Sequence, residues 1–98
     1  MTIEIKKNKE EIILEINGRL DTTTAPTLEK TINESLEDIK TLILDLKSLE
    51  YISSAGLRVL LSAQKKMQQI GTMKLKNVCE DVMGVFEITG FADILAIE

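Results

Sequence analysis

The stretch LILDLKSLEYISSAGL, residues Leu42–Leu57, contains the signals that decide the fold. Its first part, Leu42–Leu46, is almost continuously apolar, which is typical of a central strand that is covered on both faces or flanked by helices. We expect a short loop over Lys47–Ile52, followed by a helix that begins at Ser53-Ser54 and runs to Ile70. A serine at the carboxyl end of a strand and the amino end of a helix lies where α/β sheets usually place a ligand or a reactive group.

The residues at the N-terminus predict an antiparallel hairpin. Ile3–Lys6 alternates apolar and charged side chains, as a half-exposed strand does. The more apolar run Ile12–Ile16 follows after a turn at Lys7–Glu10, so we expect the two strands to pair. Asn17-Gly18 is expected to end the second strand.

A helix is predicted next, from about Ala25 to Leu36 or Glu37. Pro26 suits its first turn, where the missing N–H would have no partner. The threonines of the preceding loop can cap the helix through their hydroxyl oxygens. Apolar side chains at four-residue spacing give the helix one apolar stripe: Leu28, Ile32 and Leu36.

Downstream of the serine pair, Met73–Val78 alternates again and predicts a strand parallel to the central one, with a right-handed crossover. Val82–Thr89 predicts a short last helix closed by Gly90. Phe91 and Ile94–Ile97 are expected to add packing or a final short strand. The fold class is therefore α/β, one domain over residues 1–98, with a mixed four- to five-stranded sheet and helices mainly on one side.

Composition excludes several classes of function. The 98 residues are 44% hydrophobic and 29% charged, which indicates a globular domain. A formal charge of −4 argues against nucleic-acid binding, which needs a concentrated basic face. No apolar run approaches the ~20 residues of a membrane helix, and the N-terminus has no signal-peptide core. We therefore expect no membrane insertion and a cytoplasmic location.

The residues that usually carry catalysis are scarce. The sequence has no histidine, so Ser-His and Cys-His nucleophile pairs are excluded, and Cys79 is its single cysteine. Asp21 and Asp45 could be read as a magnesium-binding or catalytic carboxylate pair, but a hard cation requires more oxygen ligands than these two supply. We therefore expect no enzyme activity, no cofactor and no metal.

The serine pair has two physical explanations. A serine is a preferred helix N-cap, and that role alone contributes about 1 kcal/mol. Gly56, for its part, would let the helix approach the sheet closely. The second explanation is modification, because a phosphate on Ser54 would face the free N–H groups and the positive end of the helix dipole. From residue types alone, capping is the stronger explanation.

The surrounding residues resemble those of a known family. The chain resembles the STAS domain of bacterial anti-sigma factor antagonists in four motifs. In chain order these are Gly18-Arg19-Leu20-Asp21, Leu44-Asp45-Leu46, Tyr51–Leu57 and Thr89-Gly90-Phe91. No single motif is specific, but the combination and the order of elements cover essentially the whole chain. Relatives in the family often continue into a further helix beyond the position of Glu98.

The resemblance implies a partner switch. The unphosphorylated antagonist of this family binds an anti-sigma factor that is also a serine kinase, and a PP2C-type phosphatase resets the switch. The family's phosphoacceptor lies two positions before the helix glycine, which is Ser54 here. The family usually has an aspartate immediately before it; this chain has Ser53, a second candidate acceptor. The resemblance implies that Asp21 lies beside the two serines. Thr22, Gly56 and Leu57 are expected to belong to the same partner-binding site.

The sequence is also compared with two alternative functions. STAS domains also serve as non-switching subunits of lipid-transport ABC complexes or of larger signalling assemblies, where the serine need not be modified. A phospho-aspartate receiver is suggested by Leu44-Asp45-Leu46, but receivers need an acidic pair after their first strand and more βα units than this length allows.

Overall fold

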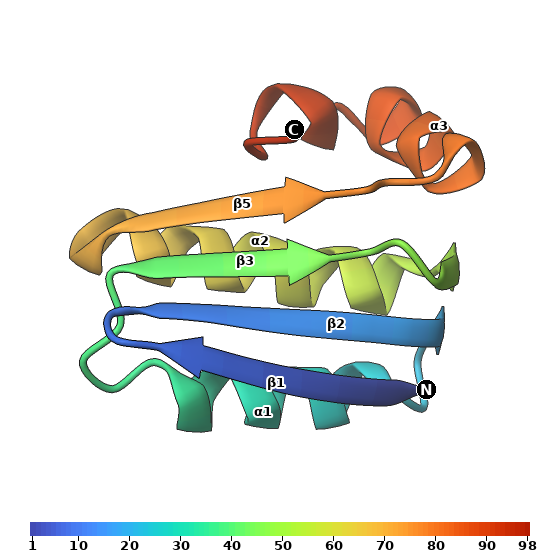
Figure 1. Ribbon diagram of the computed structural model, residues 1–98. Helices are drawn as coiled ribbons and strands as arrows, with labels where there is room; N and C mark the ends of the chain where they lie inside the picture. Colours follow the sequence, from blue (N-terminus) through green and yellow to red (C-terminus); the bar gives the residue numbers. More distant parts are fainter.

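A five-stranded mixed sheet forms one layer of the protein, and helices α1 and α2 form the other (Figure 1). The computed structural model describes all residues from Met1 to Glu98. The elements in chain order are β1 Thr2–Asn8, β2 Glu11–Leu20, α1 Ala25–Ser35, β3 Thr41–Asp45, β4 Leu49–Ile52, α2 Ser54–Ile70, β5 Thr72–Lys76, α3 Glu80–Thr89 and a 3-10 turn, η1, Phe91–Asp93. The predicted fold class is confirmed.

The N-terminal hairpin forms as predicted, but its second strand is longer. β1 pairs antiparallel with β2, with Ile3 opposite Ile16 and Ile5 opposite Leu14. The sequence predicted that Asn17 and Gly18 end the second strand, and this prediction is wrong. The strand continues to Leu20, and its register with β4 shifts at Gly18. Glycine accommodates such an irregularity because its φ of 96° there is costly for residues with a Cβ.

The central strand is β3, whose residues Leu42–Leu44 are all buried. It lies between β2 and β5 and is parallel to both. Burial on both faces explains why the apolar run identified this strand without alternation. β5 also forms as predicted, two residues shorter than Met73–Val78 at its end and one longer at its start.

The prediction of a loop over Lys47–Ile52 is wrong for its last four residues. Leu49–Ile52 forms β4, which pairs parallel with the part of β2 that extends beyond β3. Only the two ends of this four-residue strand are buried, so it lacks the alternation by which sequence patterns identify strands.

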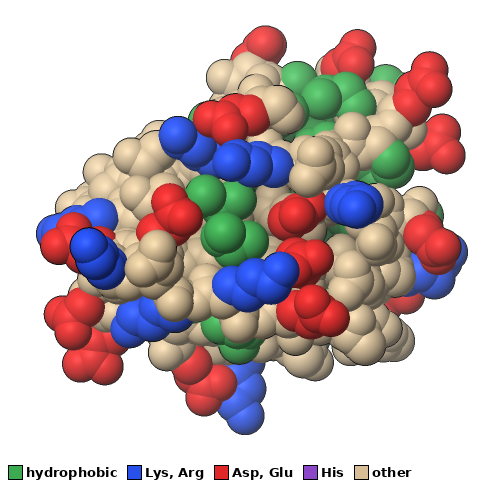
Figure 2. Space-filling model, viewed as in Figure 1, with side chains coloured by type: hydrophobic (Ala, Val, Ile, Leu, Met, Phe, Trp, Pro, Cys, Tyr) green, Lys and Arg blue, Asp and Glu red, His purple; other side chains and the backbone are tan.

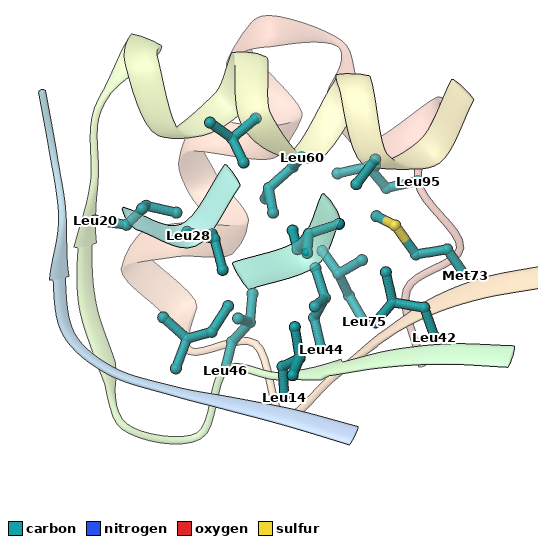
Figure 3. Packing of buried hydrophobic residues seen from close by; sticks show 14 of the residues in the cluster. Leu14, Leu20, Leu28, Leu42, Leu44, Leu46, Leu60, Met73, Leu75 and Leu95 are labelled. Atoms are coloured by element: carbon teal, nitrogen blue, oxygen red, sulfur yellow. The ribbon is translucent and has the colours of Figure 1, made fainter. Parts of the chain in front are cut away.

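The helices pack against one face of the sheet as expected. Buried side chains from the strands, such as Leu14 and Leu44, point toward Leu28 of α1 and Leu60 of α2 (Figure 3). Pro26 lies in the first turn of α1, and α2 ends at the predicted residue, Ile70. A cluster of 23 buried residues forms the core. No helix is both long and apolar enough to cross a membrane.

The chain passes very close to itself after α2. Gly71 follows the last residue of the helix, and its neighbour Thr72 donates its N–H to the carbonyl oxygen of Lys40 at 2.8 Å. A Cβ at Gly71 would collide with that same carbonyl oxygen. Only glycine therefore fits where α2 turns into β5.

The C-terminal segment extends beyond β5 (Figure 1). α3 ends at Thr89 and is closed by Gly90 in the left-handed conformation, as predicted, but it begins at Glu80, two residues before the predicted start. Leu95 is buried, so the expected packing is confirmed. A final strand does not form: Ile97 makes a single isolated bridge to Leu75.

Candidate functional site

The serine pair and the loop after β2 lie side by side because the strands that precede them are paired. Leu20, the last residue of β2, is the register partner of Ile52, the last residue of β4. Ser53 then donates its backbone N–H to the carbonyl oxygen of Leu20 at 2.9 Å. We call Ser53–Leu57 together with the adjoining loop Asp21–Thr24 the serine corner.

The two serines have different environments. Ser53 is the N-cap of α2: it is half-buried and extended, and its Oγ accepts the N–H of Gly56 at 3.3 Å. Ser54 is the first helical residue, it is exposed, and its hydroxyl makes no hydrogen bond within the chain. The capping role predicted for the pair thus belongs to Ser53, and the hydroxyl of Ser54 is free.

Asp21 organises the loop on the other side of the corner. Its Oδ1 accepts the hydroxyl of Thr23 at 2.7 Å and the backbone N–H groups of Thr23 at 3.0 Å and Thr24 at 3.2 Å. The hydrogen bond from the Thr23 hydroxyl, above all, lowers the pKa of the Asp21 carboxyl below its ordinary value of 3.8, with smaller contributions from the backbone N–H groups. Asp21 is therefore a fixed negative charge at neutral pH.

The loop threonines do not cap α1, which corrects the sequence prediction. Thr24 occupies the N-cap position but makes no side-chain cap bond. Its hydroxyl donates to the carbonyl oxygen of Arg19 at 2.9 Å and accepts the N–H of Asp21 at 2.8 Å, so it holds the loop and not the helix. Thr22 is exposed at the tip of the loop.

Gly56 and Leu57 form the buried part of the serine corner. A Cβ on Gly56 would lie 2.7 Å from Cγ of Leu20 and 3.0 Å from Cγ1 of Ile52, so glycine permits the close approach of α2 to the sheet that the sequence suggested. Leu57 is only 6% exposed and belongs to the core. Both residues would influence a partner through the position of α2 and not by direct contact.

Tyr51 lies at the surface, next to Ile52 at the end of β4. Its ring is 42% exposed, and the guanidinium of Arg19 stacks over it, with Cζ 4.2 Å from the ring centroid. Arg19 Nε also lies 3.9 Å from Oδ2 of Asp21. No local sequence signal indicated this stacking, because Arg19 and Tyr51 become neighbours only through the pairing of β2 with β4.

Asp45 stands apart from Asp21. It ends β3, and its Oδ1 accepts the N–H of Lys47 and the side-chain amide of Asn77, each at 3.0 Å. Its register partner on β2 is Glu15, six residues before Asp21, which separates the two aspartates by roughly 20 Å along the strand. No group of three or more histidine, cysteine or acidic residues in the chain could hold a metal ion.

Comparison with known proteins finds similarity to one family over nearly the whole chain. The family model described as "STAS domain" matches residues 2–98. The chain is 33% identical over 98 residues to the anti-sigma-B factor antagonist of Bacillus subtilis, covering 99% of this chain and 90% of that protein. It is 36% identical over 84 residues to the putative anti-sigma factor antagonist BtrV of Bordetella bronchiseptica, covering 84% and 72%.

Solved structures agree with the fold. An anti-sigma factor antagonist from Mycobacterium paratuberculosis superimposes with a TM-score of 0.88 at 22% identity, covering 98% of this chain and 83% of that one. The phosphorylated form of SpoIIAA, a Bacillus cell fate determinant, gives a TM-score of 0.77 at 17% identity and coverages of 99% and 91%.

Proposed function

Because the chain belongs to the STAS domain family, we propose that it is an anti-sigma factor antagonist switched by phosphorylation of Ser54. In the unphosphorylated state it binds an anti-sigma factor that is also a serine kinase, and so releases a sigma factor for transcription. A PP2C-type phosphatase restores the active state. The anti-sigma factor antagonists among its relatives support the binding role. All of these steps require a cytoplasmic location and no catalysis by the chain itself.

The observation that carries the choice of acceptor is the difference between the two serine hydroxyls. Ser54 is exposed and its hydroxyl is free, whereas the oxygen of Ser53 accepts the N–H of Gly56. A kinase must bring the hydroxyl in line with a phosphoryl group, so a free and exposed hydroxyl is the better acceptor. Attack by Ser53 would also have to use an oxygen that already accepts the N–H of Gly56, so this hydrogen bond would be disturbed during phosphoryl transfer.

The same position makes the modified form tolerable. Ser54 is the first residue of α2, where backbone N–H groups and the helix dipole stabilise an anion. The phosphate would carry nearly two negative charges beside the ionised Asp21 loop. The fold would persist, and the corner would become strongly acidic. Binding would then be lost through charge and steric conflict at the interface and not through refolding.

The proposal is tested by incubating the chain with its cognate serine kinase and ATP, followed by mapping of the modified residue. Wild type and Ser53→Ala are expected to be labelled on Ser54, and Ser54→Ala to remain unlabelled. Full labelling of Ser54→Ala on Ser53 would overturn the choice of acceptor. No labelling of any variant, together with stable binding to a transporter complex, would support the non-switching STAS subunit instead.

The mechanism is tested by comparing the two forms. Phosphorylated and unphosphorylated chains are expected to give similar circular dichroism and similar amide hydrogen exchange in the core, with differences limited to the serine corner. A large change in core exchange would contradict a switch that acts by surface charge alone.

A further inference from the structure

A shallow apolar groove lies between β4 and α3. It has a volume of about 160 Å³ and is lined by Tyr51 and Ile52 on the strand and by Val82 and Val85 on the helix, with two acidic residues, Glu50 and Asp81. We call these six residues the β4–α3 groove. Since Ile52 is followed directly by Ser53, the groove adjoins the serine corner but contains neither serine.

The outer face of α3 extends this apolar surface. Asp81, Val85 and Ile88 are spaced by four and three residues, so they lie along one face of the helix. Ile88 is 89% exposed, the most exposed of the large hydrophobic side chains. Figure 2 shows hydrophobic side chains gathered over α3, with acidic side chains around them.

Charge is distributed unevenly along the chain. Residues 79–98, which include α3, contain five acidic residues and no basic one. The other residues carry eleven acidic and twelve basic side chains, so the negative net charge of the molecule comes from this last segment. Glu50 and Asp81 at the groove make no ion pair, whereas Arg19 at its edge is already stacked on Tyr51 and near Asp21.

We propose that the β4–α3 groove, together with Ile88, binds a basic amphipathic segment of the anti-sigma factor. Apolar side chains of that segment would fill the groove and cover Ile88, and its lysines or arginines would face Glu50 and Asp81. An apolar centre with charges at its rim is the usual composition of a protein interface, and complementary rim charges accelerate association. The inference rests on the proposed function, because it assigns a second contact to the same partner.

The two contacts would have separate tasks. The groove lining ends at Ile52, so a phosphate on Ser54 would leave its shape and its apolar residues unchanged. The groove would contribute affinity and orientation in either state. Control by phosphorylation would belong to the serine corner alone.

The chemistry of the groove can be tested without the natural partner. Amide chemical shifts of the isotope-labelled chain would be followed during titration with an amphipathic helical peptide of leucine and lysine, about 18 residues or five turns long. The control peptide has glutamate in place of every lysine. Shift changes over Leu49–Ile52 and Glu80–Thr89 with the lysine peptide only are expected. Changes centred elsewhere, or equal changes with both peptides, would overturn the inference.

The partner is then tested with matched variants. Glu50→Lys and Ile88→Ala are each expected to weaken binding of the anti-sigma factor several-fold, and the double variant about tenfold or more. Glu34→Lys on α1 and Ile70→Ala at the end of α2 repeat the two changes at other exposed positions and should leave the affinity unchanged. Circular dichroism would verify that all variants fold.

The outcomes separate the two proposals. If wild type binds the anti-sigma factor and the groove variants bind as well as the controls, the groove inference is wrong and the proposed function stands. If wild type does not bind it, the proposed function is wrong, the groove loses its assigned partner, and the inference fails with it.

Discussion

The close approach of α2 to the sheet at Gly56 can be tested by Gly56→Ala. The added Cβ would lie 2.7 Å from Cγ of Leu20 and 3.0 Å from Cγ1 of Ile52, both in the buried layer under the serine corner. Distances this short force either the helix or the two side chains to move. The substitution therefore tests whether the position of the corner depends on this contact.

The magnitude follows from two opposing effects. Overpacking a well-packed core costs about 1–3 kcal/mol. Replacing glycine by alanine in a helix returns at most about 1 kcal/mol, so the free energy of unfolding should fall by about 0–2 kcal/mol. Gly84 in α3 provides the matched control, because its Cβ would meet nothing within 4 Å. Gly84→Ala should raise the free energy of unfolding by about 0.5–1 kcal/mol.

Urea denaturation followed by circular dichroism measures both variants under the same conditions. The difference in free energy of unfolding between the two variants, about 1–3 kcal/mol, isolates the cost of overpacking, because the gain from replacing glycine by alanine in a helix is common to both. It corresponds to roughly 4–24 °C in melting temperature for a domain of this size. Equal stabilisation by both substitutions would refute the reasoning. Binding of the anti-sigma factor should also weaken for Gly56→Ala, since the serine corner would be displaced.

Three further predictions concern single residues. Ser53→Ala should lower the free energy of unfolding by about 1 kcal/mol through loss of the N-cap, while Ser54→Ala should be within about 0.5 kcal/mol of wild type in the same urea assay. Because folding lowers the pKa of Asp21 through the Thr23 hydroxyl, its ionised form stabilises the fold above the unfolded value of 3.8, and this contribution is lost as the pH falls through the lower folded value. The stability difference between wild type and Asp21→Asn should therefore shrink below about pH 4 in urea titrations; a difference that grew with acidity would contradict the assigned direction. Gly71→Ala should destabilise by about 3 kcal/mol or more, because its Cβ collides with a backbone carbonyl that cannot rotate away; a melting temperature equal to that of wild type would disprove the close approach.

Most of the fold could be predicted because its signals are local. The apolar run of β3 and the periodic stripes of α1 and α2 depend on neighbouring residues, and glycine marks the ends of α2 and α3. Strand β4 could not be recognised in this way. It has four residues, only its ends are buried, and it forms because β2 continues past Gly18 to pair with it.

The candidate site was predictable in position but not in its internal contacts. Strand and helix patterns alone placed the serine pair at a helix start. Sequence patterns did not show which of the two serines caps α2. Only the hydrogen bond from the N–H of Gly56 to Oγ of Ser53 identifies Ser53 as the cap and leaves the hydroxyl of Ser54 free. The hydrogen bonds that Asp21 accepts from the following threonines depend on the backbone geometry of the loop. The stacking of Arg19 on Tyr51 depends on strand pairing. No residue pattern reveals either contact.

The layering of the serine corner has a consequence for genomes that hold several related switches. Exposed Thr22 and Ser54 stand on a buried base of Leu20, Ile52 and Gly56. Mutations on the upper layer would alter recognition at little cost in folding, whereas mutations in the buried base would lower the stability of the fold more. Duplicated copies could therefore diverge quickly on the upper layer until each partner protein ignored the other copies. Insulation between parallel signalling routes would then evolve without any change of fold.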